Sequence, residues 1–427
     1  MSFIYIYTQR RPQGCAELPS VDLASIRFNY DPTAAATDAL AIRRNYSKHV
    51  PIAEWVKGET NPEQSPAAYA ITQTKGKTVT IQAKLLISDP TVTQAQIKAE
   101  GGGVLGAIDP VTVKFKNGES DPDFVTLSLP HHTLPTGGVN RTDITWNWFY
   151  KTTGDWQPIT TTAHRIYVVL DVPTGPWKQS ATPSADTQVP WTEVLDLACT
   201  WAQGATTAEA AAAAVTRRVY GNLGLKYDRK SGASAYTSGQ PVGWVFLCSA
   251  FLSFLAGKGG NGNTVNCTDC ATIVTTFANA VGCNLFASQM YSANGMSEPF
   301  KLNKMVGIGS TVWSYPFDPP GGPEFSYHEV AWTRTGSYAD PLYDACLQVD
   351  SGTNPWDWTN PSVVHTAQLP VAMTFSTFGA AVKTPIPVPF AASSYRERLA
   401  TNNAAGIERC LPRGPETYTA SGRRSLV

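Results

Sequence analysis

Hydrophobic and polar residues alternate with a period of two through much of the segment from about residue 66 to 175. The run KTVTIQAKLLI (77–87) is the clearest case, and its period is that of a strand with one buried face. Turn clusters such as KNGESDPD and LPTGG separate it from four more strand-like runs: VTVKFKNG, DFVTLSL, DITWNWFY and HRIYVVLDV. Five or more short strands joined by turns predict an antiparallel β-sandwich of the immunoglobulin-like class over residues 66–175.

The segments that flank this β pattern are less regular. Residues 1–65 contain one strand-like run, SIRFNY, and one short helical run, DALAIRRNY, and we interpret them as an N-terminal arm packed on the sandwich. The run from Pro173 to Pro190 is rich in Pro, Ser and Thr and has no apolar period. It is therefore the best candidate for a linker between domains.

The pattern becomes helical at Trp191. WTEVLDLACTWA (191–202) is amphipathic, and Thr206 with Glu209 forms a Thr-x-x-Glu capping-box pattern before the alanine-rich run 208–222. Aromatic, strand-like runs come after residue 284: TVWSYPF, FSYHEVAWT and YDACLQVD. Helices followed by strands predict an α+β domain over residues 188–350. Residues 351–427 form a C-terminal extension with one helical run, SSYRERLA, and a loose tail, YTASGRRSLV.

Composition and charge narrow the possible function classes. Hydrophobic residues make up 42% of the 427 residues and charged residues 15%, so the chain can bury substantial cores in two or three domains. Lys plus Arg and Asp plus Glu both number 33. A nucleic-acid-binding protein normally carries a basic face, so this balance argues against nucleic acid as a partner.

Location is predicted from the absence of the usual signals. The start, MSFIYIYTQRRPQG, does not have the layout of a signal peptide. The longest apolar run, Gly243 to Ala256, is shorter than the roughly 20 residues of a membrane span, and we interpret it as a buried helix. The eight cysteines form no obvious disulfide framework. We therefore expect a cytoplasmic protein without a membrane partner, although export by a route without a signal peptide stays open.

The segment with the clearest chemistry begins in the Gly/Asn-rich loop at Gly262 and enters an apolar helix that ends near Gly282. Cys267 falls at the start of this helix. Unpaired backbone N–H groups and the positive end of the helix dipole lie there, and such surroundings favour the thiolate form of a cysteine. The same N–H groups could stabilise an oxyanion on an attacked carbonyl. Asp269 lies in the first turn, where a carboxylate suits the helix dipole, and a structural role is sufficient to explain it.

A thiolate nucleophile needs a basic partner. Of the six histidines, only His328 lies in the same predicted domain, on the strand-like run FSYHEVAW. Asp344 follows sixteen residues later in YDACLQVD, and neighbouring strands could place the two side chains together. Asp340 and Asp350 are the alternatives for the carboxylate.

The order of these residues resembles that of transglutaminase-like domains, which belong to the papain-like cysteine enzymes. The matching runs are Cys267-Thr-Asp-Cys-Ala271 with a helix ending at Gly282, His328-Glu-Val-Ala-Trp332, and Asp344 in the strand that follows. The resemblance covers about 190 to 350 and is closest to the bacterial or phage type. It implies a catalytic triad of Cys267, His328 and Asp344, with no cofactor and no metal. Cys270 departs from the family pattern, and so does the long aromatic-rich stretch between Gly282 and His328.

The same residues allow other interpretations. Cys267 and Cys270 could form a redox pair, and Cys267, Cys270 and Cys283 could contribute to a zinc site that lacks a fourth ligand. No side-chain oxyanion donor stands out, since Asn261, Asn263 and Asn266 suit turns. Four aromatic residues could line a cleft or fill the core: Trp313, Tyr315, Phe317 and Phe325.

The sequence thus favours an enzyme that attacks amide bonds of a protein or peptide substrate through a Cys267 thioester. Water as the acceptor would make it a protease or amidase, and an amine would make it a transglutaminase. The alternative function is a catalytically inactive binding or scaffold protein with the same fold. The sequence predicts no oligomeric state.

Overall fold

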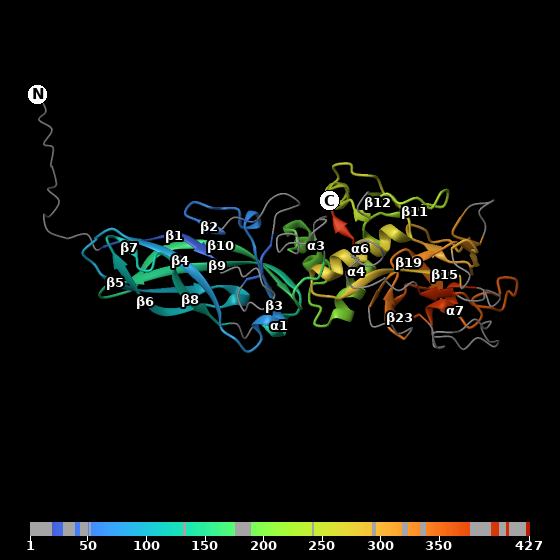
Figure 1. The fold of residues 1–427 in the computed structure, drawn as a ribbon. Coiled ribbons are helices and arrows are strands. Elements are labelled where there is room, and N and C mark those ends of the chain that lie inside the picture. The colour runs from blue at the N-terminus through green and yellow to red at the C-terminus, as the bar shows by residue number, and fades with distance from the viewer. Residues whose placement is uncertain are drawn as a thin grey trace, which may run out of the picture.

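The computed structural model describes residues 19–28, 39–42, 50, 53–130, 134–175, 189–240, 243–292, 296–317, 323–333, 339–375, 394–400, 407–409 and 424–427. It shows a mixed α+β protein rich in strands. Strands β1–β10 form one lobe, and the helices α3–α6 with the later strands form a second lobe beside it (Figure 1). No helix among the described residues combines the length and the apolar character that a membrane span requires.

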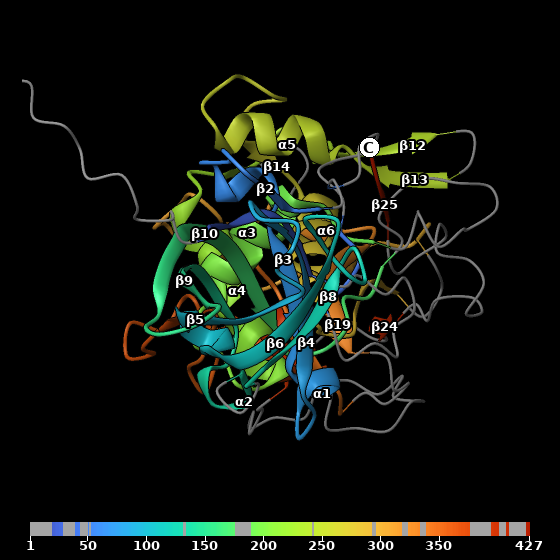
Figure 2. The same cartoon turned by 90° about the vertical axis from the view of Figure 1, so that its left-hand side faces the viewer.

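The first lobe is one strongly curled sheet, as Figure 2 shows end-on. Its strand order is β2-β1-β4-β7-β6-β5-β9-β10-β3, with β8 paired to β4, and every pairing is antiparallel except that of β3 with β10. The strands are β1 Val21–Arg27, β2 Trp55–Val56, β3 Ala67–Ala70, β4 Val79–Ile87, β5 Gln94–Gly101, β6 Ile108–Lys116, β7 Glu119–Ser120, β8 Val125–Leu129, β9 Asn140–Lys151 and β10 Gln157–Val169. Short helical turns accompany them: η1 Pro62–Gln64, α1 Ile71–Thr74, η2 Gly103–Leu105 and α2 Leu134–Gly137.

Strand β4 shows why the sequence forms this sheet. Its residues alternate strictly between buried and half-buried positions, so one face packs into the core of the lobe. The predicted antiparallel strands of residues 66–175 are therefore present. Among the longer strands of this segment, β5 is the one that the alternating pattern did not predict. The described part of the first 65 residues adds β1 and β2 to the same sheet. The immunoglobulin-like class of this sheet stays a prediction, as do the domain boundaries.

The second lobe is built around one buried helix. Its helices are α3 Thr192–Trp201, α4 Ala208–Asn222, α5 Cys248–Leu255, α6 Cys267–Ala280 and α7 Tyr395–Leu399. Its main sheet has the order β23-β20-β19-β15-β24, formed by β15 Leu285–Ser292, β19 His328–Thr333, β20 Pro341–Tyr343, β23 Val371–Thr374 and β24 Ile407–Arg409. Every residue of α6 is buried, because α3 and α4 pack against it together with β15 and β19.

Four small sheets complete this lobe among the described residues. The first pairs β11 Lys226–Tyr227 with β14 Thr264–Val265, and another pairs β16 Phe300–Lys301 with β18 Glu324–Phe325. A three-stranded one contains β17 Val306–Gly307, β21 Leu347–Asp350 and β22 Ala367–Gln368. A further three-stranded sheet holds β12 Thr237–Gln240, β13 Gly243–Phe246 and β25 Ser425–Leu426.

Several local predictions were wrong in detail. The N-cap of α4 is Thr207, whose side chain accepts a hydrogen bond from the Ala210 N–H, and not Thr206, although the helix covers the predicted run 208–222. The apolar run Gly243 to Ala256 is half strand and half helix, because β13 precedes α5. The aromatic run 311–317 forms no strand, and its backbone makes only an isolated bridge between Ser314 and Met305.

The C-terminal residues also differ from the predicted loose tail. Strand β25 pairs in parallel with β13, as Figure 2 shows, and Arg424, Ser425 and Leu426 are buried. The Arg424 guanidinium lies 2.7 Å from the Glu329 carboxylate on β19 and donates a hydrogen bond of 2.7 Å to Thr272 Oγ1 on α6. The end of the chain therefore joins the central helix to the central strand. Residues 418–423 of the predicted tail lie outside the described residues.

Replacing Arg424 with alanine will lower the free energy of unfolding by about 3 kcal/mol, because a buried carboxylate loses its partner. The side chains of Arg424 and Glu329 are only 6% and 0% exposed. Urea denaturation measures this loss, and Lys57→Ala is the control variant. Lys57 pairs with Asp22 at 2.9 Å, yet these side chains are 63% and 55% exposed, so that loss should stay below about 1 kcal/mol. Equal losses in the two variants would contradict the assigned role of Arg424.

Candidate active site

Cys267 is the first residue of α6, and its position is fixed by the residue before it. Asn266 is the N-cap: its side-chain oxygen accepts a hydrogen bond of 3.0 Å from the Asp269 N–H, and the Asp269 carboxylate accepts one of 3.3 Å from the Asn266 N–H. This reciprocal pair is a capping box. It holds the start of the helix rigidly, and Cys267 stands at the positive end of the helix dipole, as predicted.

Asp269 anchors this helix start to the preceding chain. Its buried carboxylate also accepts hydrogen bonds from the Ala235 N–H at 2.7 Å, the Tyr236 N–H at 2.9 Å and the Thr237 hydroxyl at 2.9 Å. Burial raises the pKa of Asp269, while these donors act in the opposite direction. The residue is thus structural, as its place in the first turn indicated.

His328 and Asp344 meet at the edge of the same site. His328 is the first residue of β19, and its Nε2 lies 3.0 Å from Asp344 Oδ2, with both side chains buried. Asp344 follows β20 and precedes β21, so it lies between two strands and not within one as predicted. Its Oδ1 accepts hydrogen bonds from the backbone N–H groups of Cys346 at 2.7 Å and Leu347 at 3.3 Å. The carboxylate is therefore held in one orientation towards the imidazole.

The surroundings of His328 favour its charged form. Burial by itself would lower the pKa of His328, but the charge and the hydrogen bond of Asp344, together with the Cys267 side chain, raise it to about 10. Because Nε2 bonds to Asp344, the buried Nδ1 is the ring nitrogen that remains for Cys267, and it has no hydrogen-bond partner among the described residues. The structure thus brings together the three residues that the sequence singled out.

Tyr395 belongs to the same cluster and was missed by sequence reasoning. It is the first residue of α7, it is fully buried, and its hydroxyl donates a hydrogen bond of 2.6 Å to Asp344 Oδ2. That oxygen also faces His328, so the tyrosine and the histidine share one acceptor. The run SSYRERLA predicted a helix, which is present, but nothing in its spacing indicated that its tyrosine reaches a carboxylate 51 residues earlier in the chain.

Replacing Tyr395 with phenylalanine will lower the free energy of unfolding by about 2 kcal/mol, since a buried hydrogen bond to a charged group is lost. The Asp344 carboxylate will also be less firmly held, so the pH dependence of Cys267 alkylation should shift. Tyr343→Phe is the matched control, because Tyr343 is a buried neighbour of Asp344 whose hydroxyl bonds to no described residue. The prediction fails if both variants unfold at the same urea concentration and alkylate with the wild-type pH profile.

A cleft of about 350 Å³ opens beside Cys267. Its described walls include Tyr227, Phe317, Phe325 and Tyr327, with Glu324 as a charged residue. The Phe325 ring stacks on His328 at 5.1 Å, and the Tyr327 hydroxyl lies 3.1 Å from Thr268 Oγ1. The cleft is thus an aromatic slot that ends at the cysteine.

The four aromatic residues considered for a cleft divide among three places. Phe317 and Phe325 line the slot beside Cys267, and Tyr315 lines a neighbouring cavity. Trp313 packs instead against Trp358 and His365. Aromatic residues that are close in the sequence therefore do not all line the same cleft.

The cysteines that could have formed a redox pair or a zinc site with Cys267 contact other residues. The Cys346 side chain lies beside Cys270, and Cys283, beyond the far end of α6, donates a hydrogen bond of 3.2 Å to the Ala208 carbonyl. No group of metal-ligating side chains occurs within the described ranges. The redox pair and the zinc site thus receive no geometric support there.

The remaining polar candidates have structural tasks. Asp350 binds His365 Nδ1 at 2.6 Å, away from His328. The Asn261, Asn263 and Asn266 amides donate to the carbonyls of Ala235, Gly224 and Gly232. His164 is buried on β10 beside Thr162, and burial lowers the pKa of His164 to about 3. The other histidines, at positions 49, 131 and 132, lie outside the described residues.

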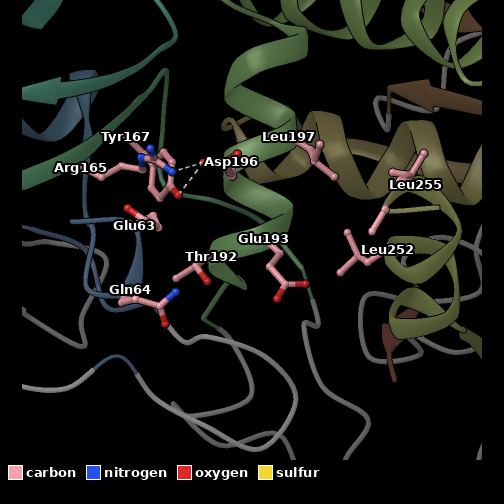
Figure 3. Close-up of a pocket in the computed structure, with 11 residues that line it drawn as sticks. Glu63, Gln64, Arg165, Tyr167, Thr192, Glu193, Asp196, Leu197, Leu252 and Leu255 are labelled. Atoms are coloured by element: carbon pink, nitrogen blue, oxygen red, sulfur yellow. Dashed lines mark hydrogen bonds and ion pairs between the residues drawn. The ribbon is translucent and has the colours of Figure 1, made fainter. Parts of the chain in front are cut away.

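A larger cavity, of about 440 Å³, lies away from Cys267 where β10, α3 and α5 meet (Figure 3). Asp196 lies at its wall and accepts hydrogen bonds from Arg141 at 2.6 Å, Arg165 at 3.4 Å and Tyr167 at 3.1 Å. Its described lining contains no cysteine or histidine. It lies between the two lobes, and its described lining offers no thiol and no imidazole.

Comparison with known proteins adds little. No family model matches the chain, and no curated protein matches it. Among solved structures, the transglutaminase of red sea bream aligns with 63% of this chain and 48% of its own, at 11% identity and a TM-score of 0.33. The similarity is weak. This chain spans about half the length of that protein, and the functional assignment rests on the site geometry alone.

Proposed function

We propose that this chain is a cysteine-nucleophile acyl-transfer enzyme that acts on amide bonds of proteins or peptides. The observation that carries the proposal is the arrangement of Cys267 at the start of a buried helix, beside a His328 that Asp344 orients, at the end of an aromatic cleft. The raised pKa of His328 supports an imidazolium beside the Cys267 side chain.

The reaction follows from this pair. The Cys267 thiolate attacks the amide carbonyl, and a C–S bond forms while the carbonyl oxygen becomes an oxyanion near the backbone N–H groups of the helix start. The His328 imidazolium gives its proton to the leaving nitrogen, the C–N bond breaks, and a thioester remains. Neutral His328 then takes a proton from water or from an amine as that acceptor attacks the thioester, which frees the thiolate again.

The proposal includes a transglutaminase-like catalytic domain over residues 188–350, joined to an immunoglobulin-like sandwich over 66–175. The chain order of a cysteine helix, a histidine strand and then an aspartate supports it. The six described cysteines carry free thiols, which suits a reducing compartment such as the cytoplasm.

The test is mass spectrometry of a cell lysate treated with the wild-type chain or with Cys267→Ala, in the presence of a biotinylated primary amine. New peptide termini, deamidated glutamines or biotinylated glutamines that need Cys267 would establish cutting, deamidation or joining. Cys270→Ala, which keeps the helix and removes a buried thiol, serves as the control and should retain the products. Identical lysates from the wild type and Cys267→Ala would overturn the proposal in favour of an inactive scaffold.

A further inference from the structure

A second cavity, of about 200 Å³, lies next to the catalytic cleft. Tyr227 lines both the cavity and the cleft. Consecutive residues also line the two spaces, because Tyr315 and Pro316 line the second cavity and Phe317 lines the cleft. The Tyr227 and Phe317 rings lie 6.2 Å apart. A substrate that reaches Cys267 through the cleft would therefore have this cavity beside it.

Two segments that line the second cavity, β11 and the turn after β17, are in close backbone contact. The Tyr227 N–H donates a hydrogen bond of 3.0 Å to the Ile308 carbonyl, which ties β11 to the turn after β17. Gly309 has a φ of +76°, and a Cβ there would lie 2.4 Å from the Leu225 carbonyl oxygen. Only glycine allows this close approach of the two segments. The cavity is thus a fixed feature of the fold.

Charge distinguishes the two spaces. The second cavity is lined by Lys226 and Arg229, and its described lining includes no carboxylate. The cleft beside Cys267 has the opposite character, because Glu324 is the charged side chain among its described walls. Lys226 is exposed, and it forms no ion pair with another residue in the described part of the chain.

The nearest carboxylate in the sequence does not neutralise the charge of Lys226. Asp228 lies outside the lining of the second cavity. Its oxygens accept hydrogen bonds from the Lys230 N–H at 3.0 Å, the Ala233 N–H at 3.0 Å and the Ser231 hydroxyl at 2.5 Å. Partial burial raises the pKa of Asp228, but these hydrogen bonds outweigh it and lower the pKa to about 2. The carboxylate is therefore held within the turn.

We propose that the second cavity is a substrate subsite that takes an acidic side chain, aspartate or glutamate, of a peptide whose carbonyl lies at Cys267. This inference rests on the proposed function. An extended peptide advances by about 3.3 Å per residue, so an acidic residue within three positions of the attacked carbonyl can reach a neighbouring cavity. Lys226 would bind the carboxylate, and Tyr227 would separate it from the cleft.

The test uses chloroacetyl peptides, which alkylate a thiol without needing turnover. Cys267 Sγ displaces chloride, so a C–S bond forms as the C–Cl bond breaks. Three pairs of otherwise identical peptides carry glutamate or glutamine at the first, second or third position from the chloroacetyl group. The rate of Cys267 modification is followed by mass spectrometry in the wild type, in Lys226→Glu and in Lys230→Glu. Lys230→Glu makes the same change in net charge on an exposed neighbour outside the cavity.

At one or more positions, the glutamate peptide should react about tenfold faster than the glutamine peptide with the wild type. That ratio should fall to one or below in Lys226→Glu, stay within about twofold of the wild-type value in Lys230→Glu, and decrease with added salt. Ratios near one at all three positions, or equal effects of the two variants, would overturn the subsite. Absolute rates no higher than those of free cysteine would contradict the nucleophile instead, and the ratio would still decide the subsite.

Discussion

Asp269→Ala will lower the free energy of unfolding by about 4 kcal/mol, which is a large share of the roughly 5–15 kcal/mol that stabilises an ordinary domain. The alanine leaves two backbone N–H groups and one hydroxyl without their acceptor: Ala235, Tyr236 and Thr237. Each buried donor without a partner costs about 1–3 kcal/mol, and loss of the capping box adds about 1 kcal/mol. Urea denaturation followed by tryptophan fluorescence measures the change.

Asp228→Ala is the matched control for this prediction. Asp228 also accepts backbone N–H groups in a turn, from Lys230, Ser231 and Ala233, but these bonds are exposed to water. Water can replace the lost acceptor there, so its loss should cost about 1 kcal/mol or less. If the two variants are destabilised equally, burial of Asp269 at the start of α6 does not have the energetic role assigned here.

His328→Gln will reduce product formation by about 10³-fold, on any substrate found with the wild type. Glutamine preserves the size of the side chain and can still bond to Asp344, but it cannot donate or accept the proton that the reaction moves. Initial rates of product release give the measurement, with Tyr343→Phe as a control that should stay within about twofold of wild type. A loss smaller than about tenfold would show that His328 is not the acid and base.

The same histidine sets a pH dependence. Its pKa is about 10 in the folded chain, above the ordinary value of 6.5, because Asp344 and Cys267 outweigh the effect of burial. The stabilisation from the protonated ring is therefore complete below about pH 6.5 and is lost as pH rises through about 10. The wild type should lose more stability than His328→Gln between pH 7 and pH 10. Parallel curves in urea titrations across that range would contradict the raised pKa.

The sequence predicted the parts of the site that depend on local structure. The loop from Gly262, the apolar run and the terminal Gly282 together indicate a helix that starts at Cys267, and the structure has this helix. His328 is the one histidine that the sequence places in the same predicted domain as Cys267, on a strand-like run, and β19 begins there. Local propensity and hydrophobic period carry this kind of information well.

The parts that the sequence did not predict depend on contacts between distant segments. Tyr395 reaches Asp344 across 51 residues, and Arg424 reaches Thr272 across 152. The strand β25 is short and lies next to Gly422-Arg423, which resemble a mobile tail in composition. Its order comes from pairing with β13 and from a buried ion pair, and neither has a local signal.

The central claim is that Cys267 is an activated nucleophile paired with His328. The most direct test is alkylation by iodoacetamide at pH 6, with the modification of each cysteine followed by mass spectrometry in the wild type and in His328→Gln. An unperturbed thiol is almost wholly protonated at that pH, so only a pre-formed thiolate reacts quickly. We predict that Cys267 reacts first, about 30-fold faster than free cysteine, and that His328→Gln removes most of this advantage. A Cys267 that reacts no faster than free cysteine, or equally fast in both proteins, would contradict the account.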